Sequence, residues 1–115
     1  MKDGFLENWT SQLRKGILEL YVLNALLNEK LYGYDIVRRL RELPGLVITE
    51  GTIYPVLSRL KREGLVETTL EESQEGPARK YYKLSKSGFS AIDQMNGQWK
   101  RIVEGIEQIN RKESE

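Results

Sequence analysis

The side chains best suited to molecular recognition gather in one stretch of the chain, residues 49–64. Placed on a helix, at roughly 100° per residue, Ile53, Leu57 and Leu60 fall on one line. The opposite surface carries small residues, hydroxyls, an aromatic ring and cations, with no carboxylate at its centre. Such a surface can enter a groove that is edged by phosphates. An ordinary amphipathic helix with a solvated face is the alternative, and this stretch alone does not decide between the two.

The composition argues against an enzyme. The 115 residues include no histidine and no cysteine, which excludes disulfides and thiol chemistry and removes the usual general base and nearly every soft-metal site. Carboxylates remain, but no paired arrangement of them converges in the sequence. We therefore expect no catalytic activity, no metal and no cofactor.

Length and charge set further bounds. A chain of 115 residues is large enough for a single core and too small for two. Its 18 Lys and Arg against 17 Asp and Glu give a net charge of +1, so nucleic-acid binding would depend on where the cations lie. The first four residues lack the character of a signal peptide, and no apolar run reaches membrane-spanning length. We expect a cytoplasmic protein that does not interact with membranes.

The most apolar part of the chain belongs to a first predicted helix, residues 5–28. Its segment 17–27 is apolar at nearly every position, so this helix should lie at the centre of the core and be buried on several sides. Ahead of that segment, Phe5 and Trp9 continue the helical spacing beyond what a small core can cover. They either pack against a second subunit or fray, and we favour the second subunit.

Two further helices make a helix-turn-helix candidate. One spans residues 33–43 and stops at Pro44-Gly45, because proline cannot continue the hydrogen-bond ladder and glycine suits a turn. The other is the stretch 49–64, where Thr49 suits the N-cap and Gly64 the C′ position. Two helices joined by a short turn, the second with an exposed polar face, are typical of this motif.

A β-hairpin is predicted directly behind these helices. Residues 65–70 and 79–84 are rich in β-branched and aromatic side chains, and residues 71–78 between them have the composition of a long turn. A hairpin in this place is the wing of a winged helix, whose cations Arg79 and Lys80 would meet phosphates or the minor groove. The alternative is a hairpin that merely covers the core, and the order of the elements argues against it.

A long last helix is predicted from a cap at Ser85 or Ser87 to about residue 112. Apolar side chains recur along it every seven positions in two series offset by three, which is an a/d seam. The two series are Ile92, Trp99 and Ile106, and Met95, Ile102 and Ile109. A helix of about 27 residues spans about 40 Å, more than a domain of this size can cover. The seam is therefore expected to meet its own copy in a two-fold dimer.

Four segments, in this order, resemble the PadR family of bacterial transcriptional regulators. They are residues 31–36 (LYGYDI), 49–55 (TEGTIYP), 59–65 (RLKREGL) and 76–85 (GPARKYYKLS). The combination of GTIYP with GPARKYY in one short chain is the specific part of the likeness. Together with the long first and last helices, it covers nearly the whole chain.

The resemblance implies both a fold and a function. The fold would be mostly α with a small two-stranded β-hairpin: a winged helix-turn-helix over residues 1–84 and a C-terminal dimerisation helix over residues 85–115. The function would be that of a homodimeric repressor that binds an inverted-repeat operator in double-stranded DNA and is released by a small aromatic effector. In a multidrug-sensing branch of the family, a tryptophan on the last helix stacks on flat ligands, and Trp99 occupies the matching place. Plain dimer core is the alternative role for Trp99.

Two sets of site residues follow from these interpretations. The residues predicted to contact DNA are Tyr34, Thr49, Gly51, Thr52, Tyr54, Pro55, Ser58, Arg59, Lys61, Arg62, Gly76, Arg79 and Lys80. The residues predicted to form the dimer interface are Phe5, Trp9, Phe89, Ile92, Met95, Trp99, Ile102, Ile106 and Ile109. A winged-helix module that binds another protein is the second hypothesis, and the groove-shaped face of residues 49–64 counts against it.

Overall fold

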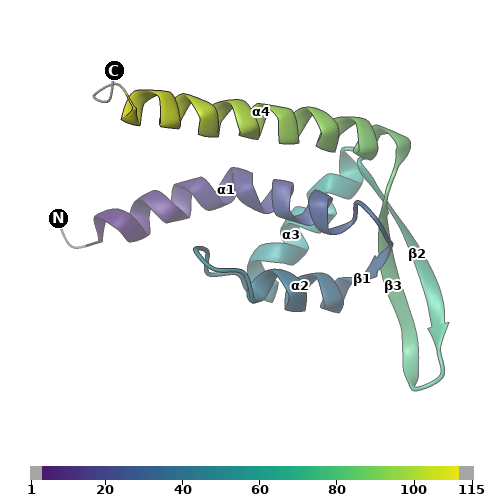
Figure 1. Cartoon of the computed structure of the whole chain (residues 1–115). Coiled ribbons are helices and arrows are strands. Elements are labelled where there is room, and N and C mark those ends of the chain that lie inside the picture. The colour runs from purple at the N-terminus through teal and green to yellow at the C-terminus, as the bar shows by residue number, and fades with distance from the viewer. Residues whose placement is uncertain (1–3, 112–115) are drawn as a thin grey trace.

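A computed structural model of the chain describes residues 4–111. Figure 1 shows α1 and α4 side by side, α2 and α3 below them, and β2 and β3 projecting as a hairpin. The bounds of the elements are α1 Phe5–Ala25, β1 Leu31–Tyr32, α2 Gly33–Arg41, α3 Glu50–Arg62, β2 Val66–Ser73, β3 Gly76–Leu84 and α4 Lys86–Asn110. Within the described range, no helix is long and apolar enough to cross a membrane.

One core is built from the apolar faces that the sequence predicted. Val22 and Leu23 of α1 are fully covered, and the apolar stripes of α2 and α3 pack with them in one cluster. The buried residues of α3 are Ile53, Leu57 and Leu60, the three that were predicted to share a line. Burying a side chain of this kind contributes about 1.5–3 kcal/mol. These anchors hold α3 on the core and leave its opposite surface outward.

Local hydrogen bonds fix both ends of α3. Thr49 is its N-cap, and the Thr49 N–H donates to the Thr52 hydroxyl at 3.0 Å while that hydroxyl donates to the Thr49 carbonyl at 2.8 Å. At the other end Gly64 has a φ of 78°, and the N–H of Leu65 donates to the Leu60 carbonyl at 3.0 Å. This is the Schellman arrangement, which requires a left-handed residue at C′. Both predicted ends of the helix are therefore confirmed.

The wing belongs to a three-stranded antiparallel sheet with the order β1-β3-β2. The prediction of a two-stranded hairpin missed β1, because a strand of two residues is too short to show an alternating pattern. β1 pairs with the base of β3 and places Tyr32 opposite Tyr81. Since α2 follows β1 without a break, the third strand ties the base of the wing to the start of α2.

The strands of the hairpin are longer than predicted. β2 continues to Ser73 and β3 begins at Gly76, so the turn consists of residues 74–75 rather than a long tip. The register of the pairing shifts between Glu71–Arg79 and Ser73–Gly76, so that two residues of β3, Pro77 and Ala78, lie across from one residue of β2, Glu72. A shift of this kind accommodates a proline, which cannot donate to a ladder. The wing is therefore a rigid paired ribbon almost to its end.

The start of α4 is joined closely to the end of α3. Ser85 caps α4 by accepting the Gly88 N–H at 3.0 Å, and its hydroxyl donates to the Gly64 carbonyl at 2.6 Å. The Ser85 N–H also donates to the Leu65 carbonyl at 3.0 Å. A Cβ on Gly88 would lie only 2.1 Å from the Leu65 carbonyl oxygen. Of the two serines that could cap the helix, Ser85 does so, and it also links α4 to α3.

Only the first half of α4 packs on the core of its own chain. Ile92 is 2% exposed and belongs to that core, which corrects the prediction that it contacts a second chain. Met95 also packs partly against the core. Because α4 begins against the Leu65 backbone, its first seam positions meet its own domain. Heptad spacing identifies a buried stripe but not the partner that each position meets.

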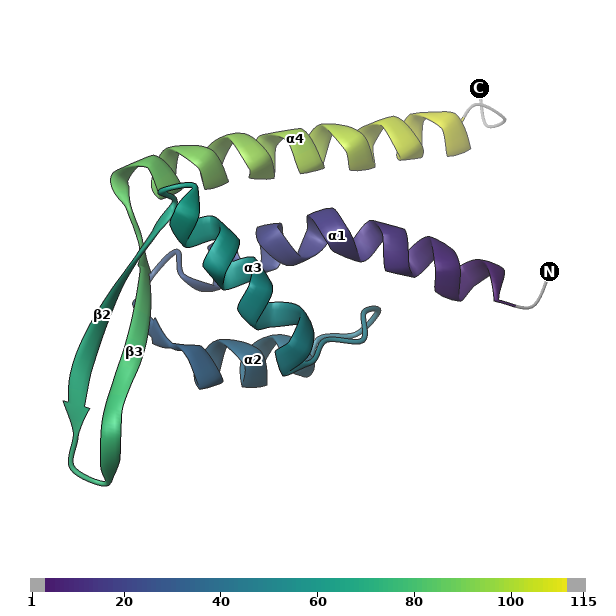
Figure 2. The ribbon, with the colours of Figure 1, turned by 180° about the vertical axis from the view of Figure 1, so that it is seen from behind.

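A pair of amides fixes α4 against α1. Asn24 and Asn96 exchange two side-chain hydrogen bonds of 3.0 Å, and the Asn24 amide also donates to the Leu20 carbonyl at 2.9 Å. From there the N-terminal half of α1 and the C-terminal half of α4 extend in the same direction, away from the wing (Figures 1 and 2). The outer half of α4 therefore leaves the winged-helix core.

Candidate nucleic-acid interface

The predicted DNA-contact residues lie on the molecular surface. Of the thirteen, twelve are exposed and Thr52 is half-buried. Figure 2 shows α3 on the near side of the domain, between the hairpin and the N-terminal half of α1. Gly76 lies apart from α3, at the far end of the hairpin, because it starts β3. The outward surface of α3 thus has two flanks, one toward α2 and the wing and one toward α1.

Tyr54 occupies the flank toward α2 and the wing. A Cβ built on Gly33 would lie 3.3 Å from Cε1 of Tyr54 and 3.4 Å from Cε1 of Tyr82, so the missing side chain at Gly33 makes room for both rings. The Tyr54 ring is packed against the start of α2, yet the residue is 39% exposed. Its hydroxyl also lies close to Gly33, 3.6 Å from the same Cβ position, so contact with the start of α2 fixes the ring and hydroxyl while part of the residue stays open to solvent.

Further tyrosines from β1, α2 and β3 gather beside this flank. The Tyr32 ring lies 6.4 Å from the Tyr34 ring and 5.9 Å from the Tyr81 ring, measured between centroids. The Arg79 guanidinium lies 5.0 Å over the Tyr32 ring, a distance at which the cation is attracted to the ring. We call Tyr32, Tyr34, Tyr54, Tyr81 and Arg79 the tyrosine surface. This surface joins α3 to the wing.

Burial raises the pKa of the Tyr54 hydroxyl above its usual 10.0, so the hydroxyl is protonated at neutral pH. The negative charge of Glu50, and that of Tyr32 and Tyr34 when they ionise, would repel a phenolate at Tyr54 and raises this pKa further. Burial also raises the pKa of Tyr82, with a smaller effect from Tyr54. A protonated phenol can donate a hydrogen bond to a phosphate oxygen, which is how many proteins position themselves on DNA.

Arg79 and Lys80 lie on opposite faces of the hairpin, because successive residues of a strand alternate. Arg79 shares its face with Tyr81 and reaches the Tyr32 ring. Lys80 shares its face with Tyr82, whose side chain is buried. The two cations predicted for the wing can therefore reach different parts of a bound duplex.

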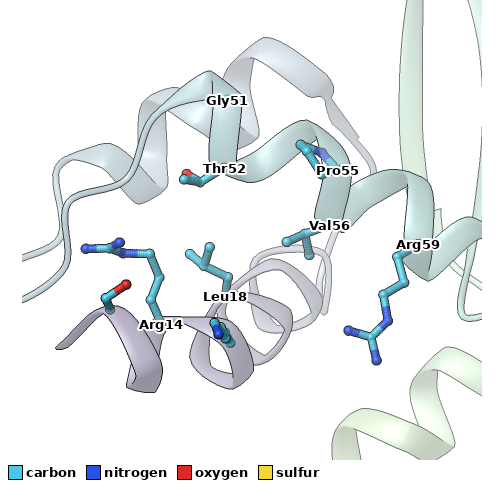
Figure 3. A pocket seen from close by; sticks show the side chains of 9 residues that line it. Arg14, Leu18, Gly51, Thr52, Pro55, Val56 and Arg59 are labelled. Atoms are coloured by element: carbon cyan, nitrogen blue, oxygen red, sulfur yellow. The ribbon is translucent and has the colours of Figure 1, made fainter. Parts of the chain in front are cut away.

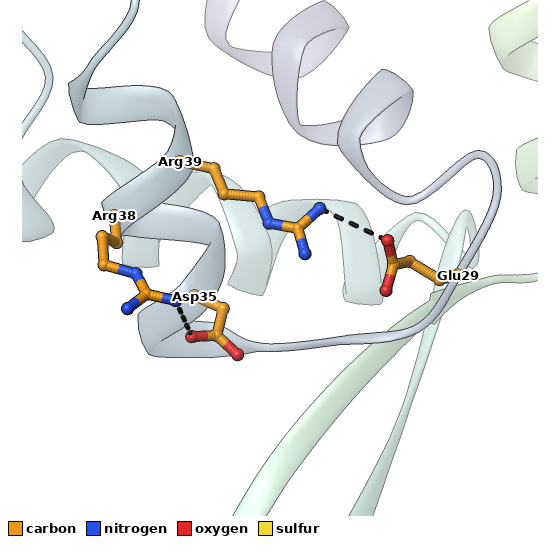
Figure 4. A network of polar contacts seen from close by, with 4 residues as sticks. All are labelled: Glu29, Asp35, Arg38 and Arg39. Atoms are coloured by element: carbon orange, nitrogen blue, oxygen red, sulfur yellow. Dashed lines mark hydrogen bonds and ion pairs between the residues drawn. The ribbon is translucent and has the colours of Figure 1, made fainter.

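Two arginines of α2 are already paired with carboxylates. Arg38 contacts Asp35 at 3.0 Å, and Arg39 contacts Glu29 at 3.4 Å (Figure 4). Exposed pairs of this kind contribute only about 0–1 kcal/mol to stability. They do, however, reduce the positive potential that α2 presents to solvent.

The cations of α3 are less neutralised. Arg59 contacts Glu19 of α1 at 3.1 Å, whereas Lys61 and Arg62 form no ion pair with any residue that the structure describes. Lys80 of the wing is equally unpaired within the described range. Local cations are thus available although the chain as a whole is nearly neutral.

The other flank of α3 faces α1 across a hollow of about 520 Å³ (Figure 3). Its lining residues are Ser11, Arg14, Lys15 and Leu18 from α1, and Gly51, Thr52, Pro55, Val56 and Arg59 from α3. Four of these α3 residues were predicted to contact DNA, whereas no α1 residue was. Helix α3 is therefore flanked on one side by the wing and the tyrosine surface and on the other side by α1.

Trp99, the predicted effector residue, borders two apolar hollows next to α1. One, of about 320 Å³, lies between α1 and α4, and the other, of about 380 Å³, reaches the loop after α2. Both are lined by Leu13, Ile17, Leu20 and Trp99. The hollow between the helices is bordered by one polar side chain, Gln98. Trp99 itself is 39% exposed, so its ring is accessible from solvent.

Most residues predicted for the dimer interface are uncovered in the single chain. The exposed ones are Phe5, Trp9, Phe89, Trp99, Ile102, Ile106 and Ile109. They lie on α1 and α4, and large exposed apolar patches are typical of interaction sites in soluble proteins. Ile92 does not belong to this surface, for the reason given above.

The residues predicted to contact DNA include neither Tyr32 and Tyr81 of the tyrosine surface nor the α1 cations Arg14 and Lys15 that line the hollow beside α3. A usable signal for Tyr32 was the glycine between two tyrosines, because glycine at such a place indicates a close approach of another group. For Arg14 and Lys15 no local signal existed. Their relevance depends on α3, which is distant in sequence and reaches α1 only in the folded chain.

Comparison with known proteins agrees with this geometry. The model of the transcriptional regulator PadR-like family matches residues 22–94. A PadR-like transcription factor from Bacteroides fragilis is 41% identical, with a TM-score of 0.74 over 89% of this chain and 98% of that one. A PadR-like transcriptional regulator from Bacillus cereus is 32% identical, with a TM-score of 0.78 over 87% and 97% of the two chains.

A relative outside the solved structures is the transcriptional activator GvpE1 from Halobacterium salinarum. It is 32% identical over 103 residues, which are 81% of this chain but only 50% of the activator. The matched family and the structural neighbours are transcriptional regulators rather than enzymes. With the winged helix, the exposed recognition helix and a family match that spans most of the fold, the chain belongs to the PadR-like family of DNA-binding transcriptional regulators.

Proposed function

We propose that the chain acts as a homodimer on an inverted-repeat operator, with one α3 in the major groove of each half-site. The tyrosine surface carries this proposal, because it aligns a protonated Tyr54 and a wing arginine with the outward side of α3. Lys61 and Arg62 add unpaired cations for the flanking phosphates. Two-fold symmetry would set the half-sites one DNA turn apart, about 34–36 Å.

The exposed apolar surface of α1 and α4 supports the dimer. Trp99, Ile102 and Ile106 continue the heptad seam beyond the point where the protomer's own core ends. In a two-fold dimer the same surface serves both copies, so each exposed seam position gains a partner. The dimer would then hold the two α3 helices at a fixed separation.

Direct DNA binding can be tested with duplexes from the promoter region of the protein's own gene. We expect binding to the promoter duplex to weaken steeply with salt, and K61A and R62A each to lower the salt slope by about one unit. K100A, an exposed lysine on the outer half of α4, is the matched control and should leave the slope unchanged. Salt-independent association with a protein, with no binding to DNA, would instead favour the protein-binding module.

The direction of regulation has two candidates. A repressor follows from the resemblance to the family, whereas the relative named as an activator favours activation. A promoter–reporter strain with and without the protein distinguishes them. A repressor lowers reporter output and an activator raises it, and a DNA-binding variant such as R62A should lose either effect.

For the effector we propose a small planar aromatic molecule that stacks on Trp99. The support is the pair of apolar hollows on this ring and its partial exposure. In a W9F background Trp99 is the only tryptophan, so planar aromatic compounds should quench its fluorescence saturably while the dimer persists. Absence of quenching would leave Trp99 as dimer core alone.

A further inference from the structure

The hollow between α1 and α3 differs from the apolar hollows around Trp99 because cations border it. Arg14 and Lys15 of α1 and Arg59 of α3 are among its lining residues, and no carboxylate belongs to its described lining. Leu18 and Val56 face each other across its floor (Figure 3). The hollow thus has an apolar floor and a positively charged rim.

The cations on the rim are not equally available. Arg59 is held by Glu19, and Figure 3 shows its side chain directed away from Arg14. Arg14 and Lys15, by contrast, make no ion pair or side-chain hydrogen bond with any residue between 4 and 111. Two neighbouring positive charges therefore lack an anionic partner within the described part of the chain.

Arg14 carries a second sign of a missing partner. Its Nε–H is shielded from solvent and has no hydrogen-bond acceptor. Buried donors in native proteins are nearly always paired, with protein groups or with ordered water, so this N–H is free to bind one further acceptor. A guanidinium binds phosphate through two adjacent N–H groups, and the unpaired Nε–H of Arg14 can be one of them.

The opposite wall adds donors that suit an anion. Figure 3 shows Arg14 on α1 on the opposite side of the hollow from Thr52, in the first turn of α3. Within the first turn of α3, the Thr52 N–H donates to the Thr49 carbonyl at 3.1 Å, whereas the N–H groups of Glu50 and Gly51 have no acceptor among the described residues. Nothing but the Thr49 hydroxyl lies within 4 Å of the Cβ position of Gly51, which leaves its N–H accessible. Helix N-termini with adjacent cations are common phosphate sites.

We infer that this hollow binds a phosphate group, held by Arg14 and Lys15 and by the first turn of α3. The phosphate can come from the DNA backbone beside the recognition helix or from a free phosphorylated molecule. A phosphate of the DNA backbone in this hollow rests on the proposed function and extends the DNA interface from α3 and the wing to α1. A free phosphorylated molecule in the hollow would instead place a small anion against α3, the helix proposed to contact DNA.

Two measurements on the full chain separate these sources. In the first, the salt dependence of promoter-duplex binding is measured for R14Q and K15Q, with R101Q on α4 as the matched control. A backbone phosphate in the hollow predicts that each α1 variant lowers the slope of log K against log salt by about 0.9. R101Q should leave the slope unchanged, and R14K, which keeps the charge, should restore it.

In the second measurement, inorganic phosphate is titrated into the protein without DNA. A free anion predicts saturable shifts of the Gly51 and Thr52 amide resonances that R14Q abolishes and R101Q keeps. Either result supports the site and identifies its source. Unchanged salt slopes together with unchanged resonances would overturn it. If the wild type binds no DNA at all, the proposed function fails, while the phosphate titration still reports on the hollow.

Discussion

The Cα of Gly88 lies against the Leu65 carbonyl, where the end of α3 meets the start of α4. G88A places a methyl group in the space of that oxygen, so α4 must move away from α3. We expect the free energy of unfolding to fall by about 1–3 kcal/mol, measured by urea denaturation. G97A on the same helix is the control, because its Cβ would meet only the Arg101 side chain, at 3.7 Å. Equal losses of unfolding free energy in G88A and G97A would contradict the close contact between Gly88 and the Leu65 carbonyl.

The titration of single side chains gives a second prediction at this scale. Tyr54 and Tyr82 have raised pKa values, so the folded state holds their protons more tightly than the unfolded state does. Their contribution to stability is complete below pH 10 and is lost only as pH rises through the raised values. The chain contains no histidine, the side chain that ordinarily titrates near neutrality.

Promoter binding at constant ionic strength should therefore change by less than about twofold between pH 6 and 9. Fluorescence anisotropy across that range checks this expectation. A transition in promoter binding with a midpoint near pH 7 would contradict it.

At the scale of elements, the wing is a two-faced ribbon. Arg79 is held on the Tyr32 ring and Lys80 lies on the opposite face, so a hairpin beside a groove can present one cation to each DNA strand. R79A and K80A should each lower the salt slope of promoter binding by about one unit. Y32A should lower the salt slope by part of the amount that R79A does. In the double variant Y32A/R79A the slope should be close to that of R79A alone, whereas in Y32A/K80A the two reductions should add. An unchanged salt slope in R79A would show that this face of the wing does not contact DNA.

The elements differ in how far the sequence predicts them. The two ends of α3 are fixed by local capping at Thr49 and Gly64, and both ends were predicted correctly. The pairing of Leu31–Tyr32 with β3 joins residues about fifty positions apart, and two residues carry too little periodicity to reveal it. Ile92 shows the same limit in α4, because a seven-residue repeat predicts burial without identifying the covering surface.

At the scale of the whole molecule, the prediction concerns the outer half of α4. Ile106 is 53% exposed in the single chain, so I106E should change the stability of the isolated fold little. In a dimer seam the same charge would be buried against its own copy. We expect I106E to be monomeric in sedimentation experiments and to bind the promoter roughly 100-fold more weakly, since two linked half-site contacts become one. Q108E, about 200° around the helix, is the matched control and should remain dimeric.

The sequence by itself determined the winged-helix order, the inward faces of the helices, the ends of α3 and the family likeness, because each depends on short-range periodicity, capping or a continuous motif. The tertiary structure alone decided which outward residues act together. It brought Tyr32 beneath Arg79, placed Arg14 across from the first turn of α3, and divided the α4 seam into a core half and an exposed half. These relations join segments that are distant in the chain, and only the packing of the helices and the sheet brings them into contact.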